Sequence, residues 1–221
     1  MANPALLILT YRTKAKADQV VAELSQSFPL VKLQTLELDL ESPDSIRKAA
    51  QELNASISHL DVLINNAGIM SVQERTLTAQ GIEVQFATNH LGHFLFTNLI
   101  LEKLKAAAQN SPDGATRVVN VSGGWHQFGP VRFSDLNFEG KPMPEEEKPD
   151  KDYLAKFGHS TENLYIPEVA YAQSKTANIL FSVYLTEHLS KHGIISFALN
   201  PGGRFNVPSR FLLSASRTIT V

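Results

Sequence analysis

The sequence predicts an α/β fold, a doubly wound parallel sheet that forms a single domain over residues 1–221. Segments with strand character alternate with segments of helical periodicity, which is typical of parallel βαβ units with helices on both faces. The strand segments are continuous apolar runs, as expected of strands that are buried on both faces. A length of 221 residues suits one domain with a sizeable core.

Runs rich in apolar and β-branched residues give the strands, which we expect at residues 5–11, 31–40, 60–65, 117–122 and 194–199. The first run holds five strictly apolar residues, Ala5 to Leu9, too few to cross a bilayer, which takes roughly 20. No basic segment precedes it and no cleavage site follows it. We therefore expect a buried strand, and a cytoplasmic protein without a membrane span.

Helical spacing of apolar residues predicts helices at residues 14–28, 42–57, 78–109 and 169–192. In the first, Val20, Val21 and Leu24 share a face. Ser42 suits the N-cap of the second because Pro43 follows it at the first helical position. Gly193 suits the residue that ends the last helix.

Residues 125–168 lack a clear period, and we expect them to form a lid or insertion. The acidic run Glu145, Glu146 and Glu147 in this segment is typical of a solvated surface, and a protein-binding role for the segment is the alternative. Residues 204–221 are expected to form an irregular tail.

Composition excludes several classes of function. The net charge is −2 and the pI is about 6.4, so the sequence gives no electrostatic reason to expect nucleic acid. The chain has no cysteine, which excludes a disulfide scaffold and a thiolate zinc site, and no metal site is expected. A small-molecule substrate is the expected partner.

Residues 171–175 read Tyr-Ala-Gln-Ser-Lys at the start of the last expected helix. Tyr171 and Lys175 therefore share a helix face, with Cβ atoms roughly 6 Å apart. A nearby ammonium lowers the pKa of a phenol from about 10 toward neutrality, which makes the tyrosine a usable general acid or base. The alternative is a surface pair on an amphipathic helix.

Four further segments accompany this pair in a fixed order: residues 63–68 (Leu-Ile-Asn-Asn-Ala-Gly), 89–94 (Asn-His-Leu-Gly-His-Phe), 117–122 (Arg-Val-Val-Asn-Val-Ser) and 200–202 (Asn-Pro-Gly). Together they resemble the short-chain dehydrogenase/reductase family over residues 5 to about 203. Residues 174–178 (Ser-Lys-Thr-Ala-Asn) look most like its retinol-dehydrogenase-like branch, including fungal relatives. The resemblance implies a Rossmann-like fold.

The resemblance also implies roles. Tyr171 would pass a proton to a carbonyl oxygen, Lys175 would assist it and bind ribose hydroxyls, and Asn89 would hold a water of the proton relay. The residues expected to border a nicotinamide cofactor are Arg12, Asp39, Leu40, Asn66, Gly68, Tyr171, Lys175, Pro201 and Gly202. Arg12 suits a 2′-phosphate, so the expected cofactor is NADP(H). The alternative for Arg12 is an ordinary cationic helix start.

The sequence departs from the family pattern at both ends. Gly68 is the first glycine, so the glycine-rich strand–turn–helix is lacking, about 30 residues of the pattern, and the fold is expected to be truncated at both ends. The lacking strand would lie between the strands at residues 5–11 and 60–65. Those two strands would then pair directly, or keep unpaired edges, or receive a strand from another chain, unless the sequence itself is an incomplete product.

A third departure concerns the serine that orients the substrate carbonyl, because Gly123 stands at its position. Ser122 lies one residue earlier and should point to the other face of the strand. Ser122 and His126 are the candidate substrate residues, and Trp125 is a further candidate for the wall of the pocket.

Two functions follow. The first is an NADP(H)-dependent oxidoreductase that interconverts a carbonyl and an alcohol on a lipophilic small molecule. The alternative is a non-redox or inactive descendant of the family. By the same resemblance, a homodimer formed through the helices at residues 78–109 and 169–192 is expected.

Overall fold

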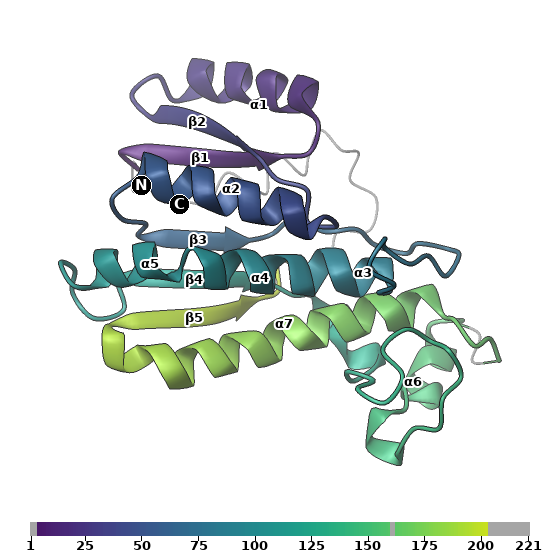
Figure 1. Ribbon diagram of the computed structural model, residues 1–221. Coiled ribbons are helices and arrows are strands. Elements are labelled where there is room, and N and C mark those ends of the chain that lie inside the picture. The colour runs from purple at the N-terminus through teal and green to yellow at the C-terminus, as the bar shows by residue number, and fades with distance from the viewer. Residues whose placement is uncertain (1–3, 160–161, 203–221) are drawn as a thin grey trace.

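The computed structural model describes residues 4–159 and 162–202, which contain five parallel strands in two sheets. One sheet pairs β1 (Leu6–Tyr11) with β2 (Lys32–Glu37), and the other has the order β3 (Val62–Asn65), β4 (Thr116–Val121) and β5 (Ile194–Leu199). Figure 1 shows the strands side by side in the order β2, β1, β3, β4, β5. All five expected strands are confirmed.

The two sheets meet at β1 and β3, for which direct pairing, unpaired edges and a strand from another chain were the structural alternatives. Hydrogen bonding joins β1 to β2 and β3 to β4, and within the described residues no ladder joins β1 to β3. A shared core holds the sheets together instead, because Ile8 of β1 and Leu63 of β3 pack against the same buried cluster. Within the described residues, the edges of β1 and β3 that face each other are thus unpaired.

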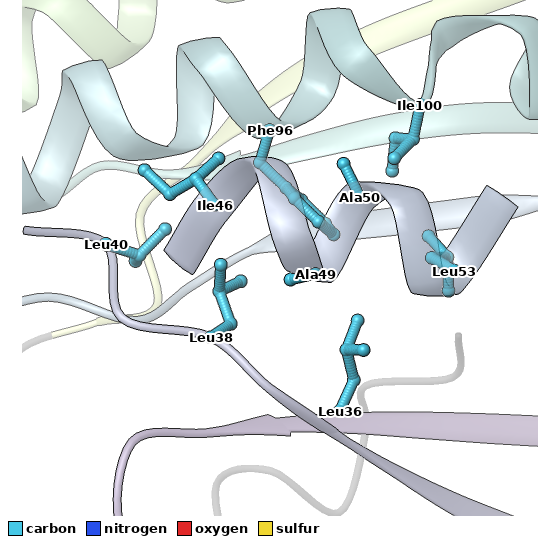
Figure 2. Packing of buried hydrophobic residues seen from close by; sticks show 9 residues of the cluster. All are labelled: Leu36, Leu38, Leu40, Ile46, Ala49, Ala50, Leu53, Phe96 and Ile100. Atoms are coloured by element: carbon cyan, nitrogen blue, oxygen red, sulfur yellow. The ribbon is translucent and has the colours of Figure 1, made fainter. Parts of the chain in front are cut away.

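That cluster is centred on α2 (Pro43–Ser56). In Figure 2, the apolar side chains of α2 lie between residues 36–40 on one side and Phe96 and Ile100 on the other. The nine buried members are Leu36, Leu38, Leu40, Ile46, Ala49, Ala50, Leu53, Phe96 and Ile100. As expected, Ser42 caps this helix by accepting a hydrogen bond from the backbone N of Ser45.

The remaining helices are α1 (Lys14–Ser27), α3 (Val84–Phe86), α4 (Gly92–Leu99), α5 (Leu101–Ala108), α6 (Lys151–Lys156) and α7 (Pro167–Leu189). In Figure 1, α2, α4, α5 and α7 lie on the viewer's side of the strands. Phe197 and Leu199 of β5 are 48% and 44% exposed. Coverage of both sheet faces, which the sequence predicted, is therefore incomplete within the described residues.

The prediction of one continuous helix over residues 78–109 is wrong. The helical segment begins only at Val84, and it is interrupted twice. Residues 77–83 form a turn closed by a bridge between Leu77 and Glu83, and the Glu83 carboxylate then accepts a hydrogen bond from the backbone N of Phe86. A π-helical turn, Ala87–Leu91, separates α3 from α4, and Ile100 leaves helical geometry between α4 and α5. Capping and a change of helix type thus override a periodic sequence pattern.

The insertion has more structure than its sequence suggests. It contains α6 and two 3₁₀ turns, Gly124–Phe128 and Glu145–Glu147. Phe128, Phe138 and Leu154 form a buried cluster with the start of α7, while Glu145 and Glu146 are exposed. The segment is thus fastened to the helix that carries Tyr171. The expected tail at residues 204–221 lies outside the described residues.

No helix in the described part of the chain is long and apolar enough to cross a membrane.

Candidate active site

A small cavity opens where the carboxyl ends of β3, β4 and β5 face α7. Parallel strands bring their carboxyl ends to one edge of a sheet, which is where α/β folds bind ligands. The cavity has a volume of about 170 Å³ and is lined by Asn66, Gly68, Ile69, Met70, Val121, Ser122, Tyr171, Lys175 and Pro201. Six of the residues singled out in the sequence are thus together.

Tyr171 and Lys175 lie in the first turns of α7, one helical turn apart. The Lys175 Nζ is 5.3 Å from the centre of the Tyr171 ring. Lys175 is only 4% exposed, and its Nζ donates a 2.9 Å hydrogen bond to the Val121 carbonyl oxygen at the end of β4. The sheet therefore fixes the ammonium at the cavity.

Burial controls the ionisation of both groups. It lowers the pKa of Lys175 to about 8, because the cavity wall takes the ammonium away from water. Burial also raises the pKa of the Tyr171 phenol. The expected depression of the tyrosine pKa is therefore wrong for this structure, and the phenol keeps its proton at neutral pH.

Asn89 is fully buried in the π-helical turn and ties three segments together. Its Oδ1 accepts a hydrogen bond from the backbone N of Ile69, and its Nδ2 donates to the Ile69 carbonyl oxygen and to Ser174 Oγ. Ser174 Oγ in turn donates to the Tyr171 carbonyl oxygen. The Asn89 side chain thus links the cavity wall after β3 to the helical turn that carries Tyr171.

Gly68 allows this arrangement because a Cβ at its position would lie 2.7 Å from Asn89 Oδ1. His93, which is 5% exposed, supports the same turn through a 2.7 Å hydrogen bond between its Nε2 and the Ala67 carbonyl oxygen. Burial lowers the pKa of His93 to about 4, so the imidazole is neutral at pH 7 and its Nε2 carries the proton that Ala67 accepts.

Ser122 lines the cavity, but its hydroxyl donates to the Lys175 carbonyl oxygen at 2.9 Å. His126 lies in the 3₁₀ turn after β4, where its Nδ1 donates to the Gly123 carbonyl oxygen. A Cβ built on Gly123 meets no atom within 4 Å. The position of the expected serine is therefore open, and neither Ser122 nor His126 fills it.

The other expected cofactor residues lie outside the cavity lining. Arg12 forms a 3.0 Å ion pair with Glu41, whose backbone N donates to Asp39 Oδ1. Leu40 is buried against Gly92, where an added Cβ would be 2.6 Å from the Leu40 carbonyl oxygen. Gly202 is exposed next to Pro201. The structure thus separates an Arg12 region from the Tyr171 cavity.

Comparison with known proteins identifies this architecture. The family model described as short chain dehydrogenase matches residues 1–132. An oxidoreductase of Fusarium equiseti is 39% identical over 213 residues, which cover 96% of this chain and 81% of that protein. The chain belongs to the short-chain dehydrogenase family. This confirms the family resemblance and the Rossmann-like α/β class.

Two other short-chain dehydrogenases show how much of the family fold is present. Retinol dehydrogenase 13 of Homo sapiens is 34% identical over 196 residues, and the chain spans only 50% of its length. The structure of NADPH-bound carbonyl reductase from chicken fatty liver superposes with a TM-score of 0.62 at 24% identity, covering 93% of this chain and 71% of that one. The chain thus spans about half the length of the first protein and about seven tenths of the second.

Sequence reasoning assigned no role to several residues of this short-chain dehydrogenase site. Ile69 and Met70 line the cavity directly after the Asn66–Gly68 turn, and their place in the chain was the only available signal. Ser174 stands inside the 171–175 motif, yet its bond to Asn89 depends on the π-helical turn that carries Asn89. His93 lies in the 89–94 segment that resembles the family, but that segment gave it no role of its own.

Proposed function

We propose that the protein is an NADP(H)-dependent oxidoreductase that interconverts a carbonyl and an alcohol on a lipophilic small molecule. The observation that carries the proposal is the shared cavity of Tyr171 and Lys175 at the carboxyl ends of three parallel strands. Two apolar side chains, Ile69 and Met70, line that cavity, and Met70 is 57% exposed, which suits an apolar substrate. Retinol dehydrogenases among the relatives support the same class of substrate.

The residues at the cavity fit the nicotinamide end of the cofactor. A volume of about 170 Å³ is below the roughly 300–1,000 Å³ of sites that enclose a whole ligand, so it suits one ring of the cofactor. Lys175 would hold the ribose hydroxyls, and Pro201 and Gly202 would flank the ring. Asn66 and Gly68 would border the adenosine side, Asp39 and Leu40 the adenine, and Arg12 a 2′-phosphate.

When bound, the nicotinamide supplies or accepts hydride. Tyr171 supplies the proton to the carbonyl oxygen, and Lys175 favours the negative charge that the phenol then develops. We also propose that Asn89, with its side chain committed to Ile69 and Ser174, takes part in the proton relay through its backbone. Because burial raises the pKa of Tyr171, the phenol is protonated at neutral pH, which is the state that donates a proton during carbonyl reduction.

The test is NADPH oxidation by the purified protein with a set of apolar aldehydes and ketones, compared with Tyr171→Phe. We expect the substitution to abolish turnover while cofactor binding persists. The matched control is Tyr184→Phe, which removes an exposed hydroxyl from the same helix and should leave the rate unchanged. Equal rates for wild type and Tyr171→Phe would contradict the mechanism.

A second candidate is a protein of the same family without redox activity. Gly123 leaves the position of the carbonyl-orienting serine open, and residues 1–67 contain no glycine for a phosphate-binding turn. Under this candidate the cavity binds a small molecule without hydride transfer. Ligand binding without NADPH binding or NADPH oxidation would favour it.

We also propose that the protein forms a homodimer through α4 and α7. These helices carry exposed apolar side chains, among them Phe94, Leu180 and Val183. Light scattering of wild type and of Leu180→Glu should give a dimer and a monomer, respectively.

A further inference from the structure

The Tyr171 ring has an aromatic neighbour that comes from the insertion. Trp125 lies in the 3₁₀ turn after β4, and its ring centre is 6.0 Å from that of Tyr171, with an angle of 89° between the two planes. Perpendicular aromatic pairs at this separation are attractive, because the edge of one ring is positive and the face of the other is negative. The contact therefore restrains how the Tyr171 ring can turn.

Trp125 itself is held from two sides. Thr176, directly after Lys175, donates hydrogen bonds from its Oγ1 to the carbonyl oxygens of His126 and Gly129, which ties the 3₁₀ turn to α7. The Trp125 ring also packs perpendicular to the buried Phe128 at 5.4 Å and against His159 at 6.0 Å. The indole therefore has a fixed place.

The insertion core continues to both sides of Tyr171 in the sequence. Val169, Ala170 and Ala172 of α7 are buried in the same cluster as Phe128. His159 lies 3.8 Å from the Glu168 carboxylate, in the first turn of α7. The backbone of Tyr171 is therefore anchored by this core. Trp125 contacts the phenol ring of Tyr171, which the core does not fix.

We propose that Trp125 is a positioning residue for Tyr171, a wall that holds the phenol in the orientation needed for proton transfer. This role rests on the proposed function for its effect on catalysis, while its effect on the phenol exists without any substrate. The insertion thereby acts on the chemistry through the side chain that contacts the phenol ring.

The first experiment uses the fact that Trp125 is the one tryptophan of the chain, so all intrinsic tryptophan emission comes from this position. An ionised tyrosine beside an indole quenches its emission. In an alkaline titration of wild type we expect a quenching transition that Tyr171→Phe loses and Tyr184→Phe retains. The same transition in Tyr171→Phe would overturn the proposal, and this arm needs no change at Trp125.

The second experiment follows tyrosinate absorbance in Trp125→Leu and Trp125→Phe, each compared with the same variant carrying Tyr171→Phe. Burial raises the pKa of Tyr171, so loss of the wall in Trp125→Leu should lower that pKa toward its ordinary value, and Trp125→Phe should preserve it. An unchanged Tyr171 titration in a folded Trp125→Leu protein would overturn the proposal.

The third measurement is steady-state reduction with the same variants. Trp125→Leu should lower kcat by about 3- to 10-fold with little change in KM, and Trp125→Phe should restore most of it. A wild type without turnover would contradict the proposed function only, since the two spectroscopic measurements still decide the role of Trp125. A full kcat in Trp125→Leu would overturn the positioning role.

Discussion

Ser122 and Lys175 hold each other in place across the site. The Ser122 hydroxyl donates to the Lys175 carbonyl oxygen, and the Lys175 Nζ donates to the carbonyl oxygen of Val121, the residue before Ser122; both distances are 2.9 Å. The pair locks the end of β4 to α7. Ser122 is therefore a structural link between sheet and helix, and its hydroxyl is not available to orient a carbonyl.

Restoring a serine at Gly123 should raise activity. Gly123 is extended, with φ 172° and ψ 162°, and an added Cβ meets no atom within 4 Å, so Gly123→Ser should fold without strain. Since one donor to a developing oxyanion is worth roughly 10²–10³ in rate, we expect kcat to rise at least about tenfold. Gly124→Ser is the control one residue away. Equal kcat values in the two variants would contradict the assignment of Gly123 to the position of the carbonyl-orienting serine.

Charge at Arg12 should set the preference for NADPH over NADH. Glu41 pairs with Arg12 at 3.0 Å and competes with a 2′-phosphate for the guanidinium. Arg12→Ala should weaken NADPH binding about tenfold and leave NADH binding unchanged, because only NADPH carries the phosphate. Glu41→Gln should instead tighten NADPH binding. Arg47→Ala, which removes an exposed cationic side chain from α2, is the control, and a similar effect there would indicate general electrostatics.

Stability should rise between pH 8 and pH 10 because of Lys175. The folded pKa of Lys175 is about 8 and its ordinary value is 10.5, so in this window the unfolded chain binds more protons than the folded one. At roughly 1.4 kcal/mol per pKa unit, the gain is about 3 kcal/mol over the full interval. The raised pKa of Tyr171 acts only above its ordinary value of 10, and in the opposite direction.

Urea unfolding at several pH values measures this gain. Lys175→Met should lack the rise and should be at least as stable as wild type at pH 7, because it removes a buried ammonium. A parallel pH dependence in the two proteins would mean that another group titrates in the window.

Gly92 should tolerate no side chain. An added Cβ would lie 2.6 Å from the Leu40 carbonyl oxygen, a backbone atom that cannot move without shifting the segment after β2. We expect Gly92→Ala to lower the free energy of unfolding by about 1–3 kcal/mol. Gly124→Ala, whose Cβ would have room, is the control, and equal stability of the two variants would contradict the close approach of α4 to Leu40.

The sequence predicted the strands, the α2 cap and six of the nine residues that line the cavity, because apolar runs and short motifs record local structure. It could not predict the direction of the Tyr171 pKa shift, which depends on burial in the folded chain. The core of Phe128, Phe138, Leu154 and Ile166 joins residues spaced far apart in the chain, so it leaves no period to recognise. The π-helical turn at Asn89 could not be predicted for a related reason, because the bonds of Asn89 to Ile69 and Ser174 join residues far apart in the chain.

The central claim is that the cavity of Tyr171 and Lys175 receives a nicotinamide ring. Titration of the full chain with NADPH, followed by nicotinamide fluorescence, tests it most directly when Lys175→Met is titrated in parallel. We expect saturable binding to wild type with a micromolar Kd, and a Kd weakened by about tenfold or more in Lys175→Met. Binding that is absent in wild type, or equally tight in both proteins, would contradict the claim.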